Sequence, residues 1–302
     1  MSDSTRIEFP ARDGVTLRGD FYQAQGQGVP IAVMATGFSL LKETNAGFAR
    51  EIRKAGISVL AFDYRSFGSS DGVPRQEIDL NRQSEDMSDA VTAARGLPGV
   101  DPAKVIAWGV GHGASNAIMA AGNDPRVVAT ALHIPFVSGA FDASGYPAGL
   151  LDRAWEDLEL KTRAGDSRPT YAKVFRDWAE DGKGDEGTVF IKGPAGYHFY
   201  AATMADSAST GTPWENQVTL RSFLNVAGTE ARDVAYKVKC PAMYVVNEND
   251  PLAAPTEFQR EVFERMGPNV GFKEIPSREG KNLGDQLAEG CAFLIDWVRT
   301  VV

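Results

Sequence analysis

The stretch Val105-Ile106-Ala107-Trp108-Gly109-Val110-Gly111-His112-Gly113 joins a short apolar run to three glycines that alternate with larger residues. A continuous apolar run of this length is typical of a strand that is buried on both faces of a parallel sheet. Glycine allows the close approach and the unusual backbone angles that a sharp turn requires. The stretch therefore predicts a buried strand, a tight turn and the beginning of a helix.

Similar apolar runs recur along the chain, and helical patterns such as Phe48–Ala55 and Glu77–Arg95 separate most of them. Alternating apolar and polar residues over positions 6–22 predict a hairpin with one wet face before the first run. Buried strands that alternate with helices predict an α/β fold, with a mostly parallel sheet flanked by helices. The other predicted buried strands are Ile31–Ala35, Ile57–Phe62, Val127–Leu132, Ala242–Val246 and Phe272–Ile275.

The region from Ser138 to about Lys239 breaks this rhythm. It contains glycine-rich connections and patterns that predict helical pieces over Leu150–Leu160, Tyr171–Trp178 and Trp214–Leu224. Open α/β sheets bind ligands where the strands end, so an insertion there covers the binding site. We therefore expect a core of residues 1–137 and 240–302, with residues 138–239 forming a lid segment.

Composition narrows the classes of partner. The net charge is −9 and the acidic residues are scattered, which argues against nucleic acid and against an anionic membrane surface as partners. No stretch of about 18 apolar residues predicts a transmembrane helix, and the N-terminus lacks the pattern of a signal peptide. Together with two isolated cysteines, Cys240 and Cys291, this predicts a reduced, cytoplasmic protein.

No set of His, Cys, Asp and Glu has the spacing of metal ligands, so we expect neither a metal nor a cofactor. The three glycines of the opening stretch do not match a dinucleotide fingerprint, because the last one comes a residue early. The expected partner is a small-molecule substrate. The sequence leaves a homodimer open.

Five local patterns follow the successive buried strands in a fixed order. In this order the chain resembles the α/β-hydrolase superfamily, and it is particularly similar to the group of fungal polyketide transferases and related hydrolases of secondary metabolism. The resemblance covers nearly the whole chain. The patterns are Gly37-Phe38 with Lys42-Glu43, the run Asp63–Gly72, the glycine-rich turn Gly109–Gly113, the run Pro135–Gly139, and Asn247–Pro255.

The chain departs from this family at the residues that carry its usual chemistry. The family holds a nucleophilic serine in the turn G-x-S-x-G, and that position is Gly111 here. Asp250 matches the family's acid, but no histidine occurs in the stretch Pro276–Leu283 where the family has one. Since two of the three members of a Ser-His-Asp triad are missing, the resemblance does not imply ordinary ester hydrolysis.

The oxyanion hole of the family consists mostly of backbone, so it can persist without the serine. By resemblance, its donors are the N–H groups of Phe38 and His112. Donors at a helix N-terminus favour a developing negative charge or a bound carbonyl oxygen. The missing side chain also enlarges the floor of the pocket. The expected pocket residues are Thr36, Gly111, Tyr197, His198, Trp214 and Lys281.

Three residues are candidates for proton transfer, and each has a structural alternative. His112 begins the helix after the turn, where the helix dipole lowers its pKa, but it can also replace an aromatic filler. His133 ends a strand near the same site, where a histidine is often hydrogen-bonded scaffolding. Asp250 is either a general base or a cap of its own loop.

The other selected residues also have two interpretations. His198 and Tyr197 belong to an aromatic cluster that either lines a ligand pocket or packs the lid segment. Trp214 is expected to hold the lid segment against the core. Lys281 is otherwise a solvated loop charge, and Arg65 is expected to be a structural tie.

These observations support three functional hypotheses. The first is a non-hydrolytic enzyme that binds a small carbonyl or polyketide-like substrate and carries out cyclisation, C–C bond formation or cleavage, or isomerisation. The second is a ligand-binding protein that kept the fold and lost catalysis. The third is a hydrolase or acyltransferase that uses an activated water, with Asp250 or His112 as the base.

Overall fold

The computed structural model describes residues 3–175, 189–191, 207–208, 211–248, 250, 253–267, 270–277 and 283–302. Eight strands form one sheet in the order β1-β2-β4-β3-β5-β6-β10-β11. The first two pairings are antiparallel and the remaining ones are parallel, which confirms the predicted α/β-hydrolase architecture and the N-terminal hairpin. The strands are β1 Thr5–Pro10, β2 Thr16–Tyr22, β3 Val29–Ala35, β4 Ser58–Asp63, β5 Val100–Val110, β6 Val127–His133, β10 Ala242–Asn247 and β11 Val270–Ile275.

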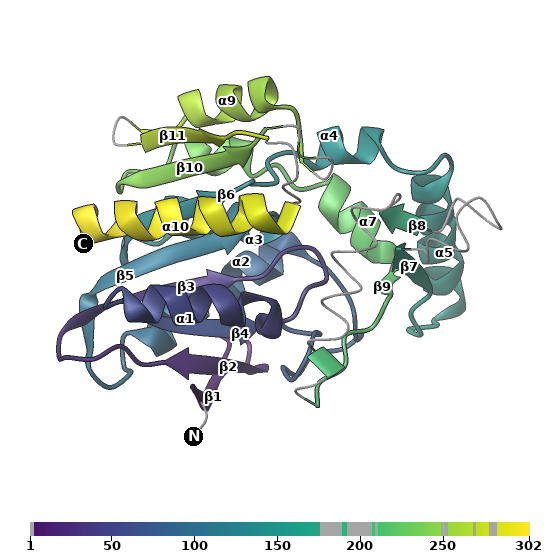
Figure 1. Cartoon of the computed structure of the whole chain (residues 1–302). Helices are drawn as coiled ribbons and strands as arrows, with labels where there is room; N and C mark the ends of the chain where they lie inside the picture. The colour runs from purple at the N-terminus through teal and green to yellow at the C-terminus, as the bar shows by residue number, and fades with distance from the viewer. Residues whose placement is uncertain are drawn as a thin grey trace.

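Helices cover both faces of this sheet (Figure 1). One face packs against α1 (Ala46–Lys54) and α10 (Leu283–Val301), and the other packs against α2 (Leu80–Ala94) and α3 (His112–Asn123). Neighbouring strand residues belong to different apolar clusters, as Val33 and Met34 do. Side chains alternate between the two faces of a strand, so burial of both faces requires the continuous apolar runs seen in the sequence.

The described elements of residues 138–239, called the lid segment here, lie beside the end of the sheet at which β6 leads into α4 (Gly139–Ser144) (Figure 1). It contains helices and a second sheet in the order β8-β7-β9. The described elements are α5 Leu150–Ala164, β7 Tyr171–Phe175, β8 Val189–Ile191, β9 Val218–Thr219, α7 Leu220–Ala227 and α8 Arg232–Ala235. The helix predicted over Leu150–Leu160 is confirmed.

One predicted helix is wrong over its described part, and another begins later than predicted. Tyr171–Phe175 is a strand, because the two faces of this aromatic and β-branched segment have different environments: Ala172 and Val174 are buried and Lys173 is exposed. The helix predicted from Trp214 begins only at Leu220. Thr219 caps it by accepting a hydrogen bond from the Ser222 backbone N–H, and the residues before it pair with β7 instead.

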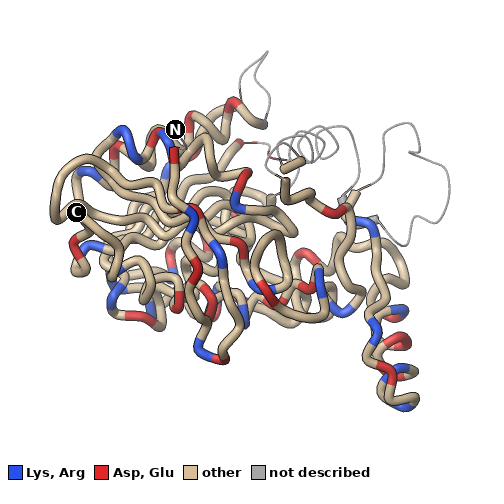
Figure 2. The backbone as a smooth tube through the Cα atoms, turned by 90° about the horizontal axis from the view of Figure 1, so that it is seen from below, with Lys and Arg blue, Asp and Glu red and all other residues tan. Residues whose placement is uncertain are grey.

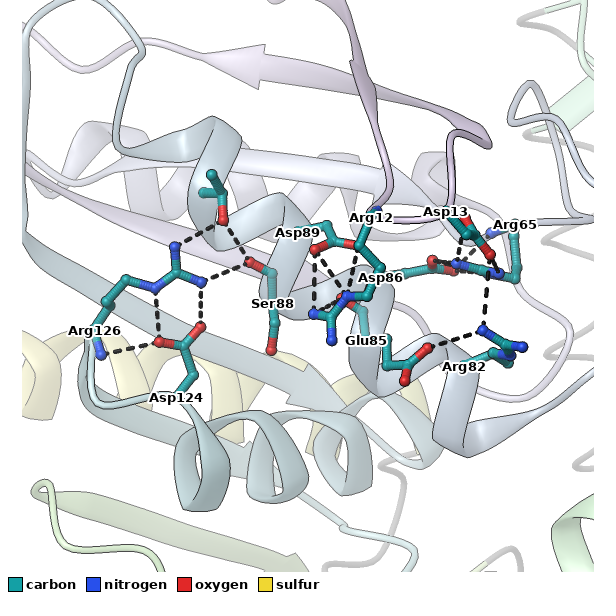
Figure 3. A network of polar contacts seen from close by, with 11 residues as sticks. Arg12, Asp13, Arg65, Arg82, Glu85, Asp86, Ser88, Asp89, Asp124 and Arg126 are labelled. Carbon is teal, nitrogen blue, oxygen red and sulfur yellow. Dashed lines mark hydrogen bonds and ion pairs between the residues drawn. The ribbon is translucent and has the colours of Figure 1, made fainter.

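Charged side chains fasten the loops of the core to α2 (Figure 3). Arg65 donates to the buried carboxylate of Asp86 at 2.6 Å and to Asp13 at 2.6 Å, which joins the β4–α2 loop to the hairpin. Arg65 is thus a structural tie, as the resemblance implied. Elsewhere in the described part of the chain, Lys and Arg are interspersed with Asp and Glu along the backbone (Figure 2). Among the described helices, none is both long and apolar enough to cross a bilayer.

Candidate functional site

Gly111 stands at the sharp turn between β5 and α3, with φ 57° and ψ −123°. Its N–H donates to the carbonyl oxygen of His133 at 3.0 Å, and its own carbonyl accepts from the backbone N–H groups of Ala114 and Phe136. Glycine tolerates a positive φ because it has no Cβ. The strand, turn and helix predicted from the opening stretch are therefore present, and the turn is anchored to the end of β6.

The three glycines of this turn have different reasons to be glycine. A methyl group at Gly109 would lie 2.2 Å from the backbone of Gly113, and one at Gly113 would lie 2.4 Å from the carbonyl oxygen of Ala35. Among the described residues, the nearest contact of a methyl group at Gly111 would be the Cα of Gly37, at 4.0 Å. Packing therefore requires the two outer glycines, whereas the central position has room for a side chain that this chain lacks.

Phe38 and His112, the predicted oxyanion donors, lie next to each other. Their rings meet edge to face with centroids 5.0 Å apart, and both residues are buried. Because α3 begins at His112, the amide of this residue belongs to the first turn, whose N–H groups have no partner within the helix. Such amides attract a carbonyl oxygen or an anion.

The imidazole of His112 is enclosed by aromatic rings. Phe136, which follows β6, also packs against it, at a centroid distance of 4.2 Å. Burial lowers the pKa of His112 to about 3, so the ring is neutral near pH 7. Its Nδ1 atom is buried and has no hydrogen-bond partner among the described residues.

The structure joins His133 to Asp250 through a residue that sequence reasoning missed. His133 Nε2 lies 3.1 Å from Oδ1 of Asn247, and Nδ2 of Asn247 donates to Asp250 at 3.3 Å. Burial lowers the pKa of His133 to about 4. Its ring packs on α10 at Gly290, where a methyl group would come within 2.3 Å of the ring. The signal for Asn247 was its place at the end of a predicted strand, three residues before Asp250.

Asp250 also lines a polar cavity of about 380 Å³ between β10 and α9 (Thr256–Glu264). Glu248, Glu274 and Arg260 are among its other lining residues. Of the described part of the chain, no group of three or more His, Cys, Asp and Glu residues could hold a metal ion.

The remaining predicted pocket residues divide into two groups. Thr36 is buried, and its Oγ1 atom has no hydrogen-bond partner among the described residues. Trp214 is buried and donates from Nε1 to the carbonyl oxygen of Ser39 at 2.6 Å, close to Phe38. Tyr197, His198 and Lys281 lie outside the described residues.

The lid segment contributes aromatic and acidic residues that the sequence did not single out. Phe223 on α7 packs between Phe38, at 6.5 Å, and Tyr146, at 5.5 Å between ring centroids. On α4, burial and then the charge of Glu230 raise the pKa of Asp142 to about 7. These residues are far from Phe38 in the sequence, and their local patterns do not distinguish them from ordinary lid packing.

Comparison with known proteins identifies the family of this chain. Residues 33–280 match the family described as alpha/beta hydrolase family. A thiohydrolase of Arthrinium phaeospermum is 34% identical, with 91% of this chain and 89% of the relative covered. A polyketide transferase of Penicillium crustosum is 32% identical, with 98% and 96% covered.

The solved structures lead to the same group. The alpha/beta hydrolase GrgF from Penicillium sp. sh18 superposes with a TM-score of 0.79 at 26% identity, covering 99% of this chain and 98% of that chain. DcsB, solved in complex with its substrate analogue, has a TM-score of 0.81 at 27% identity, covering 99% and 100%.

Proposed function

Because this chain belongs to the alpha/beta hydrolase family, we propose that it is an enzyme of that family which acts on a polyketide-like carbonyl substrate without hydrolysing it. Relatives along almost the whole chain are named polyketide transferase and thiohydrolase, and these names support the substrate class. The proposed reactions are cyclisation, C–C bond formation or cleavage, and isomerisation.

The observation that carries the proposal is the empty position at Gly111 in an otherwise complete turn. The backbone angles, the outer glycines and the start of α3 are all those of a turn that displays a nucleophile. Gly111 has no atom that can attack a carbonyl group. The chain has three histidines, and none lies in the stretch Pro276–Leu283. An acyl-enzyme formed by a triad is therefore not available to it.

A carbonyl oxygen placed at the turn would accept hydrogen bonds from the Phe38 and His112 amides. Loss of one such donor in other enzymes costs about 3–4 kcal/mol of transition-state stabilisation. The same donors stabilise an enolate or an alkoxide, which form in aldol-type and isomerisation reactions. Holding a flexible chain in a reactive conformation lowers the barrier further.

The two imidazoles are better suited to hydrogen bonding than to taking up a proton. A base whose pKa is about 3 or 4 is weak near pH 7. We propose that neutral His112 hydrogen-bonds the substrate, and that Asp250 is the first choice for proton transfer. His133 orients Asn247, which in turn holds Asp250.

Incubation of the purified protein with β-keto acyl thioesters of N-acetylcysteamine in ¹⁸O-labelled water tests this proposal. The expected product is a cyclised or rearranged compound without ¹⁸O in a new carboxyl group. The Asp250→Asn variant is expected to slow its formation at least tenfold. A labelled free acid as the product would instead support the third hypothesis, hydrolysis by an activated water.

A second candidate function is ligand binding without turnover. The observation in its favour is that both described imidazoles at the turn are buried and have strongly lowered pKa values. Calorimetry with the same thioesters, run beside the product assay, separates the two functions. Tight binding without any product, with the thioester recovered unchanged from both wild type and Asp250→Asn, would overturn the catalytic proposal.

A further inference from the structure

The loop that carries Phe38 connects β3 to a short 3-10 helix, η1 (Lys42–Asn45). It is fastened at two points, one at a strained residue, Ser39, and one after it, at Lys42. Ser39 has φ 54°, a left-handed conformation that is uncommon for residues with a side chain. Such a conformation persists only where the surroundings hold it in place.

The first fastening belongs to the core. The backbone N–H of Lys42 donates to Oδ1 of Asp63 at 2.9 Å, and its Nζ atom donates to Oδ2 at 3.1 Å. Both side chains are completely buried. Because Asp63 ends β4, this end of the loop is fixed to the sheet whatever the lid segment does.

The second fastening belongs to the lid segment. The indole N–H of Trp214 donates to the Ser39 carbonyl at 2.6 Å, and both residues are buried. The same carbonyl belongs to the residue that directly follows Phe38. A rotation of the backbone at Ser39 would therefore turn the neighbouring peptide units and move the Phe38 amide.

The position of the Trp214 ring is itself determined by the lid segment. Phe175 of β7 stacks on it with centroids 5.7 Å apart and an interplanar angle of 18°. The side-chain amide of Asn216 accepts from the Phe175 N–H and donates to the Phe175 carbonyl. The indole is thus tied to the small lid sheet, about 175 positions away from Ser39 in the sequence.

We propose that Trp214 is a positioning residue: its hydrogen bond to Ser39 aligns the Phe38 amide with the His112 amide, so that the seating of the lid sheet completes the oxyanion hole. This inference rests on the proposed function, because it assigns a role within the same carbonyl-binding site. It goes beyond holding the lid segment in place, since it predicts an effect on carbonyl chemistry in particular.

The variant Gly111→Cys supplies a chemical probe of the oxyanion hole. The new thiol has room at the turn. With p-nitrophenyl acetate it attacks the carbonyl carbon and releases p-nitrophenolate, passing through an oxyanion. With iodoacetamide it displaces iodide at a saturated carbon, and no oxyanion forms. The ratio of the acylation rate to the alkylation rate therefore reports on the hole and cancels changes in thiol exposure or pKa.

The native thiols contribute a small background that the chain without the new cysteine measures. Burial raises the pKa of Cys291 to about 12, and it also raises the pKa of Cys240, so both react slowly. We expect Trp214→Phe, added to Gly111→Cys, to lower the ratio at least tenfold. The matched control is Trp155→Phe, which changes an exposed tryptophan on α5 and is expected to leave the ratio unchanged.

Replacing Trp214 by 3-benzothienylalanine guards against a packing effect, because this isostere keeps the ring shape and lacks the N–H. It should reproduce the fall in the ratio while the alkylation rate stays constant. An unchanged ratio in both Trp214 variants, or equal losses in acylation and alkylation, would overturn the inference and leave the proposed function standing. A Gly111→Cys protein whose ratio does not exceed that of N-acetylcysteine would overturn both.

Discussion

The ends of β5 and β10 differ in how much they keep of the chemistry that the resemblance implies. At β5 the backbone of the turn is intact, but the position of the nucleophile has no side chain. At β10 the residue that matches the family's acid by resemblance, Asp250, is present, and Asn247 links it to His133. The backbone part persists because the fold itself needs it: the crowding at Gly109 and Gly113 is a matter of strand and helix packing. The side chain of a nucleophile at position 111 is not required by this packing, so the fold forms without it.

The largest expected effect tests this difference within the turn. Gly113→Ala should destabilise the protein by about 3 kcal/mol or more, since its methyl group would overlap the Ala35 carbonyl oxygen. Gly111→Ala has room and should cost only about 1–2 kcal/mol, for the left-handed backbone. Urea unfolding of both variants measures the difference. Equal losses would mean that packing, and not chemistry, accounts for Gly111.

A second test measures how the burial of His112 makes the stability of the protein depend on pH. Burial lowers the pKa of His112 to about 3, so between pH 3 and 6.5 the unfolded chain binds more protons than the folded one. The contribution of neutral His112 to the free energy of unfolding is therefore fully present above pH 6.5 and is lost as the pH falls towards 3. His112→Phe removes this loss and should improve the relative free energy of unfolding by about 2 kcal/mol between pH 8 and pH 5.

Chemical denaturation at several pH values measures this change. His133→Phe would lack the hydrogen bond to Asn247, so His112→Phe is the cleaner variant. Parallel pH curves for wild type and His112→Phe would show that His112 is accessible to protons in the folded protein, contrary to its burial.

A third test addresses the end of β10. Asn247→Ala leaves the buried Nε2 atom of His133 without this partner and should cost about 1–3 kcal/mol. Because Asn247 donates a hydrogen bond to Asp250, the same variant should also slow product formation in the thioester assay. Asn225→Ala is a suitable control, because it removes a comparable amide hydrogen bond, to the Ile78 carbonyl, away from Asp250. Unaltered turnover in Asn247→Ala would separate Asp250 from this chain of contacts.

The smallest expected effect lies in the lid segment. Burial raises the pKa of Asp142 to about 7, so the folded chain binds more protons than the unfolded one between pH 4 and 7. This contribution favours folding at low pH and is lost as the pH rises through 7. Asp142→Asn should therefore be more stable than wild type by about 1 kcal/mol at pH 8, since partial solvent contact reduces the full shift.

The difference should vanish near pH 4, where the Asp142 carboxyl is protonated in the folded state. Thermal unfolding at the two pH values checks this prediction, with Asp152→Asn on α5 as the control. A stability difference that does not depend on pH would assign the effect of Asp142→Asn to packing.

The sheet, the turn and the absence of two triad members could all be predicted from the sequence. These features are local: continuous apolar runs require strands buried on both faces, and the glycine spacing marks the turn at Gly111. Three features became visible only in the folded chain: Tyr171–Phe175 is a strand, Asn247 joins His133 to Asp250, and Trp214 holds Ser39. These contacts join residues that are far apart in the chain, and local propensity carries no information about which distant partner will satisfy a buried polar group. The sequence predicts a lowered pKa for His112 from the helix dipole, whereas the cause that the structure shows is burial, and the rings of Phe38 and Phe136 that pack against His112 are brought together by the fold alone.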